Sequence, residues 1–398
     1  MSASIEDRFA DASAILASAR DIVAERATSS APSWSVRREW QAFLSGLSDE
    51  AVIDIERAGL AAALERHPSA PADLVDLARA VRRSTDLPIA YDTSPRMPAT
   101  KRASPRKHAQ VMALAHIASH AAPLATRIVD IGSGHGHLTR HLAATLRVAA
   151  MGWERDPDRI AIARSLTAPG GPTFVELDAR EAGAALLPTD LVVGLHACGE
   201  LGDHAVRAVA RSGSALVLVG CCLQKREGDR VPLVTPPNIA TDALVLSRPM
   251  IGLGNARDGE DGIETDLATR SASRERRLAL RSLFGEAGLA LEPGEEMRGV
   301  NRRRATGSLA ELADRAFEVR RLASPTPARV AEARRHAAEL YPRLRRWELA
   351  RTMLARLIEV WVALDRAVFL ARSGGRVEVV IAFDARESPR NIAVLASG

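Results

Sequence analysis

The chain has 398 residues, of which 46% are hydrophobic and 26% are charged, and its formal net charge is +5. This size and composition are typical of a globular protein of two to four domains with a sizeable core. No apolar run approaches the roughly 20 residues that a membrane span needs. Acidic residues 6 and 7 stand where a signal peptide would be basic, and three cysteines are too few for a disulfide framework. We therefore expect a soluble, cytoplasmic protein.

The basic excess is unevenly distributed along the chain. Residues 1–100 carry a net charge of −4, whereas residues 297–356 carry +9. Lysine occurs only at positions 101, 107 and 225, so almost every cation is an arginine, which is typical of a GC-rich coding bias. The total charge therefore does not by itself indicate nucleic acid. The concentration of positive charge in residues 297–356 is the part of the composition that bears on function.

The front of the chain is predicted to be helical. Apolar residues at helical spacing predict helices over 5–27, 40–47, 51–64 and 74–81. Prolines at 95, 98 and 105, with Thr, Ser and basic residues between them, predict a linker or an ordered loop over 93–105.

From about residue 107 the pattern changes to short apolar runs that alternate with helical segments. The runs predict strands over 128–131, 148–153, 174–177, 191–195 and 215–219, with helices over 108–120, 137–146, 157–166 and 202–210. This alternation is typical of a parallel sheet covered by helices on both faces. A mostly helical insertion then reaches about residue 371, and strands over 377–383 and 392–395 form a closing hairpin.

A glycine-rich loop follows the first predicted strand and opens the next helix. Its glycines are Gly132, Gly134 and Gly136, with Ser133 between the first two and Asp130 just before them. Glycines let a backbone approach a ligand closely, and a helix N-terminus adds oriented N–H groups. A dinucleotide fingerprint has glycines at relative positions 1, 3 and 6, whereas here they fall at 1, 3 and 5. This arrangement resembles the S-adenosylmethionine loop of class I methyltransferases.

Acidic residues end the next two predicted strands. Glu154 ends the second, 18 residues after Gly136, where a carboxylate can accept both ribose hydroxyl protons. Asp178, followed by Ala179, ends the third, where methyltransferases place a group near the adenine amine. Asp130 is expected near the methionine amino group. We predict S-adenosylmethionine as the cofactor; the alternative is a degenerate or nucleotide-binding sheet whose glycines serve only the turn.

Five parallel strands followed by a late hairpin is the strand order of the class I methyltransferase sheet. The predicted fold is therefore α/β, a class I methyltransferase Rossmann-like sheet with an N-terminal helical domain and a large, mostly helical insertion before the last hairpin. The predicted boundaries are 1–92 for the helical domain, 93–222 for the cofactor-binding core, 223–371 for the insertion and 372–398 for the closing β-hairpin.

Two runs at the ends of the fourth and fifth strands resemble a known family. Residues 195–201 read Leu-His-Ala-Cys-Gly-Glu-Leu, and residues 220–222 read Gly-Cys-Cys. They are similar to the Leu-His-x-Cys-Gly-Asp-Leu and Gly-Cys-Cys runs of the family of methyltransferase-like protein twenty-five and ribosomal RNA adenine dimethylase domain-containing protein. The resemblance extends to 104–107, 364–366, 383–384 and 388–391 and covers roughly residues 39–396. It implies a methyltransferase fold that binds S-adenosylmethionine and says little about the acceptor.

The sequence departs from the family pattern at three positions. Glu200 stands where Asp is usual, which keeps the negative charge. Gln110 stands where Glu is common, which removes a negative charge. Leu223 replaces the aromatic residue that usually follows the cysteine pair, so a stacking role there is in doubt.

The end of the fourth strand faces the transferred methyl group in this fold. Enzymes that methylate base amines place Asn or Asp, two prolines and an aromatic residue there. This sequence lacks that run of residues, which argues against adenine dimethylation. His196 is the best candidate for a general base; the alternative is a histidine that fixes the loop through a backbone carbonyl. A weaker similarity, to the Lys-His-Leu-Cys-Gly run of some tRNA 2′-O-methyltransferases, points toward RNA, although Leu195 occupies the lysine position.

The three cysteines are expected to lie close together. Cys198, Cys221 and Cys222 fall on the ends of strands that pair in this fold, and with His196 they are of the types that bind zinc. None of their spacings is Cys-x-x-Cys, however, and adjacent cysteines seldom bind the same ion. We therefore predict small, buried, reduced thiols and no metal.

The basic segment supplies candidate substrate contacts. They are Arg302, Arg303, Arg304, Arg345 and Arg346, with Tyr341 and Trp347 near the second cluster. Guanidinium groups bind phosphate and aromatic rings stack on bases, whereas the alternative is a solvated arginine-rich helix face. The prediction is an S-adenosylmethionine-dependent methyltransferase of unknown acceptor, with RNA favoured. A protein or small-molecule acceptor, or a noncatalytic binding module that keeps the cofactor pocket, are the alternatives.

Overall fold

The structure is a computed structural model that describes residues 3–28, 30–64, 66–90, 105–180, 186–235, 244–256 and 267–397. Contacts divide the chain into two compact units. The first consists of residues 1–24, 76–257 and 352–398, and the second of residues 25–75 and 258–351. The predicted boundaries at 92, 222 and 371 do not coincide with these units, because both the helical front and the insertion are divided between them.

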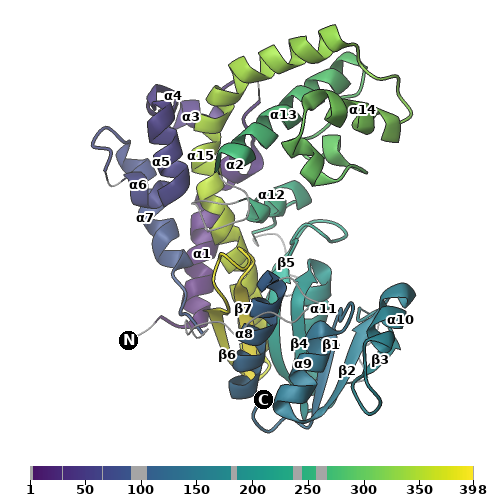
Figure 1. The fold of residues 1–398 in the computed structure, drawn as a ribbon. Coiled ribbons are helices and arrows are strands. Elements are labelled where there is room, and N and C mark those ends of the chain that lie inside the picture. Colours follow the sequence, from purple (N-terminus) through teal and green to yellow (C-terminus); the bar gives the residue numbers. More distant parts are fainter. Residues whose placement is uncertain are drawn as a thin grey trace. The chain divides into compact units, whose positions relative to one another are not determined.

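A seven-stranded sheet forms the centre of the first unit, in the order β3-β2-β1-β4-β5-β7-β6. The strands are β1 (Arg127–Ile131), β2 (Ala149–Glu154), β3 (Thr173–Glu176), β4 (Asp190–Cys198), β5 (Ala215–Cys221), β6 (Arg376–Ile381) and β7 (Ile392–Ser397). The first five pair in parallel, and β7 is antiparallel to both β5 and β6. Figure 1 shows the yellow β6 and β7 continuing the teal strands. The predicted class I methyltransferase sheet is thereby confirmed.

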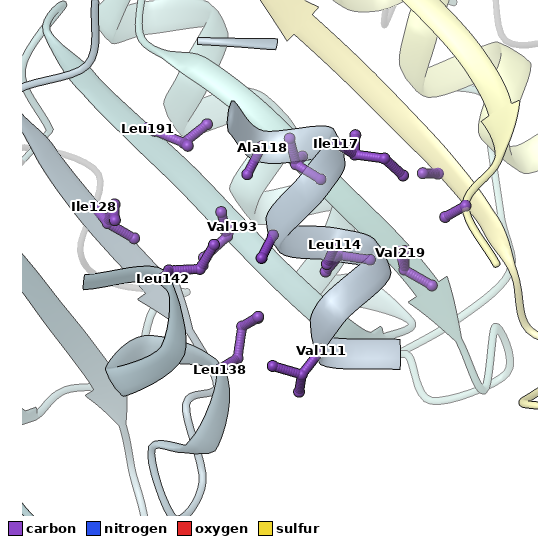
Figure 2. Packing of buried hydrophobic residues seen from close by; sticks show 14 of the residues in the cluster. Val111, Leu114, Ile117, Ala118, Ile128, Leu138, Leu142, Leu191, Val193 and Val219 are labelled. Atoms are coloured by element: carbon purple, nitrogen blue, oxygen red, sulfur yellow. The ribbon is translucent and has the colours of Figure 1, made fainter. Parts of the chain in front are cut away.

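A helix before β1 and helices between the later strands cover the sheet. They are α8 (Pro105–Ala121), α9 (His137–Leu146), α10 (Pro157–Ser165) and α11 (Glu200–Ser212). Leu114 of α8 and Leu142 of α9 lie in one buried cluster with Val193 and Val219 of the sheet (Figure 2). Each such side chain contributes roughly 1.5–3 kcal/mol by leaving water. This packing fixes α9, and with it the glycine loop that precedes α9.

The front of the chain is helical, as predicted, but it is divided into more helices than the sequence indicated. They are α1 (Ile5–Ser18), α2 (Arg20–Ala24), α3 (Ser33–Arg37), α4 (Gln41–Gly46), α5 (Asp49–Ala58), α6 (Leu60–Leu64) and α7 (Ala72–Thr85). The helix predicted over 5–27 breaks at Ala19, and the helix predicted over 51–64 breaks at Gly59, which has a φ of +81°. Helix α3 was not predicted, because it has only five residues and lies in a segment rich in Ser and Pro.

The predicted insertion is mostly helical, as expected. It contains α12 (Arg248–Gly252), η1 (Leu253–Asn255), α13 (Leu267–Glu286), η2 (Glu295–Met297), η3 (Arg302–Thr306), α14 (Leu309–Val319) and α15 (Pro327–Arg372). The core of the second unit includes Phe284 and Phe317, whose rings stack with centroids 4.5 Å apart. Among the described helices, none is both long and apolar enough to cross a membrane.

Candidate functional site

The glycine loop lies between β1 and α9, as the sequence predicts. Gly132, Gly134 and Gly136 have φ values of +70°, +55° and +70°, a region that favours glycine. A Cβ added to Gly136 would lie 2.3 Å from the Phe174 ring, so this glycine is required for packing. A Cβ added to Gly134 would meet no atom within 4 Å. The middle of the loop therefore faces open space that a ligand can occupy.

Glu154 joins the glycine loop to the end of β2. Its side chain is buried, and its Oε2 accepts a hydrogen bond from the Gly134 N–H at 3.0 Å. Its Oε1 accepts from the N–H groups of Arg155 and Asp156 at 3.0 and 3.2 Å. A carboxylate has about four acceptor sites, so Oε2 keeps capacity for one ribose hydroxyl. The hydroxyl of Ser133 is buried and has no hydrogen-bond partner among the described residues.

Asp130 is a buried acid beneath the same loop. Its carboxylate is 2% exposed and accepts a hydrogen bond from the Thr139 hydroxyl at 2.6 Å. Burial raises the pKa of Asp130 to about 6, and the bond from Thr139 only partly offsets that rise. A cationic ligand group would stabilise the ionised form. This is the environment that the ammonium group of S-adenosylmethionine needs.

Asp178 and Ala179 follow β3, where the sequence places them. The carboxylate of Asp178 binds the guanidinium of Arg180, with Oδ1 and Oδ2 both 3.0 Å from its Nε. The hydrogen bonds from Arg180 lower the pKa of Asp178 to about 2. Ala179 is buried. Asp178 is thus an ionised acceptor that already has one partner.

These features fit S-adenosylmethionine. The open space at Gly134, the unpartnered hydroxyl of Ser133 and the buried acids Asp130 and Glu154 all lie on one loop and the two strands beside it. The acids suit an ammonium group and a ribose hydroxyl, and the loop backbone suits close approach of a ligand.

His196 lies near the end of β4, where the strand loses its regular pairing. Its φ is +63°, and the pairing with β5 shifts register between Leu195 and Ala197. Its Nε2 lies 3.0 Å from Oε1 of Gln110, whose Nε2 donates to the Glu387 carbonyl at 2.7 Å.

The Gln110 contacts determine which ring nitrogen of His196 carries the proton. A carbonyl oxygen can only accept, so the amide nitrogen of Gln110 must face Glu387 and its oxygen must accept from His196. The proton therefore lies on Nε2, and Nδ1 presents a lone pair. Burial lowers the pKa of His196. A side-chain amide, rather than the backbone carbonyl of the alternative interpretation, holds this ring.

The three cysteines come together at the ends of β4 and β5. Cys198 pairs with Cys221 in the sheet register, and their sulfurs are 3.1 Å apart. Both sulfurs lie near the His196 carbonyl, at 3.4 and 3.3 Å. The sulfurs of Cys198, Cys221 and Cys222 all lie within 4.8 Å of one another, and all three are free thiols.

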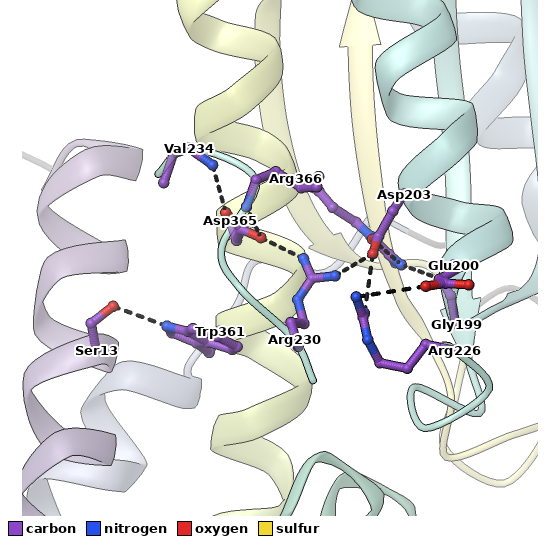
Figure 3. A network of polar contacts seen from close by, with 11 residues as sticks. Ser13, Gly199, Glu200, Asp203, Arg226, Arg230, Val234, Trp361, Asp365 and Arg366 are labelled. Carbon is purple, nitrogen blue, oxygen red and sulfur yellow. Dashed lines mark hydrogen bonds and ion pairs between the residues drawn. The ribbon is translucent and has the colours of Figure 1, made fainter. Parts of the chain in front are cut away.

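A buried network of ion pairs, which the sequence did not predict, holds the segment after β4 (Figure 3). Asp203 of α11 binds Arg366 at 2.9 Å and also binds Arg230, which in turn binds Asp365. These four side chains are between 0% and 7% exposed. The only hint in the sequence was that residues 364–366 resemble a family motif.

The network reaches the cysteine-containing run directly. Arg366 donates a hydrogen bond to the Gly199 carbonyl at 3.0 Å. Gly199 has a φ of +51°, and an added Cβ would lie 1.9 Å from the Lys225 carbonyl oxygen. The Gly199 N–H donates to the Cys221 carbonyl at 3.0 Å. The segments that follow β4 and β5 are therefore held together, and Arg366 attaches them to helix α15.

The two predicted arginine clusters have different surroundings. Arg302 and Arg303 lie in η3, and their side chains fall outside the described part of the chain; Arg304 is exposed. Arg345 and Arg346 are 14% exposed and pair with Glu56 and Asp49 at 2.6 and 2.7 Å. Glu56 and Asp49 of the acidic front thus pair with these two arginines within the second unit.

The aromatic residues near the second cluster are packed rather than exposed. Tyr341 is 9% exposed and Trp347 is 5% exposed. The Trp347 indole N–H donates to the Ser45 hydroxyl at 3.0 Å. The expectation that these rings could stack on bases is not met, because both are buried in the second unit.

Part of the chain matches a known family model, and several solved structures are similar to it. Residues 106–227 match the family model described as a methyltransferase domain. The chain is similar to a sugar N-methyltransferase from Streptoalloteichus, at 21% identity over 33% of this chain and 58% of that one, with a TM-score of 0.25. It is similar to a methyltransferase from Thiobacillus denitrificans in complex with S-adenosyl-L-homocysteine, at 20% identity over 27% and 47%, with a TM-score of 0.23.

A third similar structure is the magnesium protoporphyrin IX methyltransferase from Synechocystis, at 17% identity over 30% of this chain and 61% of that one, with a TM-score of 0.24. The chain spans less than two thirds of each of these proteins. The match of residues 106–227, together with the strand order, shows that the chain contains a class I methyltransferase domain, which depends on S-adenosylmethionine.

Proposed function

We propose that this protein methylates RNA in the cytoplasm and that it is a bacterial relative of the family of methyltransferase-like protein twenty-five. The observation that carries the family assignment is a contact. Two runs that resemble family motifs lie far apart in sequence, yet Arg366 of one binds Gly199 of the other at 3.0 Å. The departures at Glu200, Gln110 and Leu223 leave this contact intact.

The bound cofactor supplies an electrophilic methyl group, and residues of the chain bind and orient it. Glu154 accepts a ribose hydroxyl, Asp130 binds the methionine ammonium, and Asp178 with Ala179 lies beside the adenine. The glycine loop allows the close approach that this binding requires. Holding donor and acceptor in line supplies much of the rate enhancement in such transfers.

His196 is proposed to remove the proton from the acceptor. Its Nδ1 has a lone pair because Gln110 fixes the proton on Nε2. The sequence lacks the Asn-or-Asp, Pro-Pro and aromatic run of amine methylation, so a hydroxyl acceptor suits the histidine better than a base amine.

Exposed arginines of the second unit support RNA as the acceptor. Arg345 and Arg346 are occupied by intrachain ion pairs and are largely buried, whereas other cations of the basic segment face solvent. Exposed arginines that also pair with a glutamate are Arg298, Arg315, Arg329 and Arg335. Arg304, Arg321, Arg334 and Arg343 are exposed as well. Such groups bind phosphate without reading sequence.

Transfer of a tritiated methyl group from S-adenosylmethionine into total cell RNA, compared with transfer into total protein, tests the proposal. We expect RNA to be labelled. Label in protein or in small molecules would overturn the RNA assignment. Calorimetric binding of S-adenosylmethionine without any transfer would favour a noncatalytic module, and no binding to the folded protein would refute both.

Replacing Gln110 with alanine should reduce kcat by roughly tenfold, the value of one lost hydrogen bond of about 1.5 kcal/mol. The KM for S-adenosylmethionine should stay unchanged, because Gln110 positions His196 and does not contact the cofactor. Gln110→Glu should restore kcat in part, since a carboxylate accepts the same bond from His196 but cannot donate to the Glu387 carbonyl. An equal loss in both variants, or a change confined to KM, would contradict the positioning role. Steady-state kinetics measures both parameters.

Replacing the exposed pair Arg304 and Arg343 with alanine should weaken RNA binding and make it less dependent on salt. Each lost phosphate contact reduces the slope of log K against log salt by roughly 0.7 for single strands. Arg345→Ala is the matched control: it breaks the ion pair with Glu56 and should lower the unfolding free energy without changing the salt slope. Fluorescence anisotropy at several salt concentrations measures this. If the salt slope stays unchanged in the Arg304 and Arg343 variant but falls in Arg345→Ala, RNA contacts Arg345 instead.

Replacing Asp130 with asparagine should stabilise the protein while weakening cofactor binding. The pKa of Asp130 is raised, so its ionisation costs stability as the pH rises from about 4 to about 6, and the cost is constant above that range. Asparagine removes this cost, which is at most about 3 kcal/mol, and can still accept from Thr139. Urea unfolding at pH 7 and calorimetry with S-adenosylmethionine measure the two effects. A variant that is less stable, or that binds the cofactor as well as the wild type, would refute the assignment.

A further inference from the structure

The geometry at the ends of β4 and β5 removes the main objection to a metal site. Adjacent residues of a strand point to opposite faces of a sheet, so Cys221 and Cys222 would not share an ion if the strand continued. However, β5 ends at Cys221, and Cys222 has a φ of +42°. This turn brings the Cys222 sulfur back beside the other two, so all three sulfurs lie within 4.8 Å of one another.

We propose that Cys198, Cys221 and Cys222 bind one thiophilic metal ion, with Zn²⁺ as the ion that this set of donors fits. Zinc–sulfur bonds of about 2.3 Å in a tetrahedron place the sulfurs roughly 3.8 Å apart. The Cys198 and Cys221 sulfurs are 3.1 Å apart, and all three sulfurs lie within 4.8 Å of one another, so no separation exceeds the zinc value by more than about 1 Å. Binding therefore requires only small movements of the side chains.

A zinc ion on these three sulfurs would have a charged neighbour. Zinc binds cysteine in the thiolate form. Three thiolates with Zn²⁺ have a net charge of −1, and the Lys225 ammonium, 3.9 Å from the Cys198 sulfur, offsets it. Metal binding should therefore release the thiol protons.

The backbone holds the three sulfurs in a fixed arrangement. Cys198 and Cys221 are paired in the sheet, and the Gly199 N–H binds the Cys221 carbonyl. Positive φ values at His196 and Cys222 cost free energy and persist where the surroundings enforce them, often at functional sites. A site that is held in this way loses little entropy when it binds an ion.

The proposed site has three protein ligands. Within the described part of the chain, the group of mutually close ligand atoms contains only these three sulfurs. Cys198 and Cys222 are partly exposed, so solvent can complete a tetrahedron. Three protein ligands with one open position are typical of reactive rather than purely structural zinc sites. The proposal stands independently of the methyl acceptor.

Cobalt substitution tests the site on the full-length protein. Metal is removed with a chelator under reducing conditions, and Co²⁺ is then titrated. We expect one equivalent to produce the ultraviolet thiolate-to-cobalt band and the visible bands of tetrahedral cobalt, and Zn²⁺ to abolish both. If no such band appears, and if the three thiols react with a disulfide reagent at the same rate with and without Zn²⁺, the proposal is wrong.

Single substitutions then identify the ligands. Cys222→Ser should lower Zn²⁺ affinity, measured against a competing chelator, by more than about 100-fold, which exceeds the usual effect of losing a neighbour of a ligand. His135→Ala, which removes an exposed loop histidine, should keep wild-type affinity. Wild-type affinity in Cys222→Ser would refute the site. If that variant fails to fold, the wild-type cobalt spectrum decides the question by itself.

Discussion

Replacing Asp203 with alanine should destabilise the protein by about 3–5 kcal/mol, the usual cost of removing one partner from a buried ion pair. Asp203 is 5% exposed and faces Arg226, Arg230 and Arg366. Without its carboxylate, these guanidinium groups lose the anion that they share, in a region that water does not reach. Natural domains are stable by only about 5–15 kcal/mol, so the loss is a large fraction of the total.

Urea unfolding measures this loss, and Asp76→Ala is the matched control. Asp76 pairs with Arg79 at 3.8 Å on the surface of α7, and its side chain is 76% exposed. Pairs of this kind contribute about 0–1 kcal/mol, so the control should unfold almost as the wild type does. A cost at Asp203 no greater than the cost at Asp76 would show that the buried network does not stabilise the fold.

The pH dependence of the Asp203 effect has a definite sign. Burial opposes ionisation of Asp203, but the attraction of Arg230 and Arg366 outweighs it and lowers the pKa to about 2. The carboxylate therefore contributes stability at pH values above about 4, and this contribution is lost as the pH falls toward 2. The difference between wild type and Asp203→Ala should shrink over the same interval.

Replacing His196 with alanine should reduce the rate of methyl transfer by about 10²–10⁴-fold, the range that a positioned general base contributes. The loss should appear in kcat, because the ring lies at the end of β4, whereas the cofactor residues lie on the glycine loop and at the ends of β2 and β3. Binding of S-adenosylmethionine, measured by calorimetry, should be unchanged.

The control for His196 is His120→Ala, since His120 is exposed in the last turn of α8 and has no assigned role in proton transfer or cofactor binding. That variant should transfer methyl groups at close to the wild-type rate. Full transfer by His196→Ala on the true substrate would show that another group, or solvent, takes the proton, and that His196 serves only to shape the loop.

The glycine loop between β1 and α9 could be predicted because its pattern is local. Three glycines lie between a strand and a helix, and acidic residues end neighbouring parallel strands. Once the strand order is known, these residues are expected to lie together. Gln110 is different. Its contact with His196 joins residues 86 positions apart in sequence, and no spacing rule predicts which buried amide will reach which ring.

The partners of the charged residues also could not be predicted from the sequence. The sequence correctly located an excess of arginine in 297–356, but it could not show that Arg345 and Arg346 meet Glu56 and Asp49 inside the second unit. A linear charge pattern does not identify partners. Similarly, the positive φ of Cys222 reverses the face on which its sulfur lies, and this depends on how the chain leaves β5 rather than on residue type.

The network of Asp203, Arg230, Asp365 and Arg366 has a consequence for work on fragments of this protein. Residues 352–397 supply two of these four side chains, and they also supply β7, which pairs with β5. A fragment limited to residues 106–227, the region that matches the methyltransferase model, would lack Arg230, Asp365 and Arg366 and would leave one edge of β5 unpaired. We therefore expect such a fragment to leave the segment after β4 without its supports, so binding studies require the longer chain.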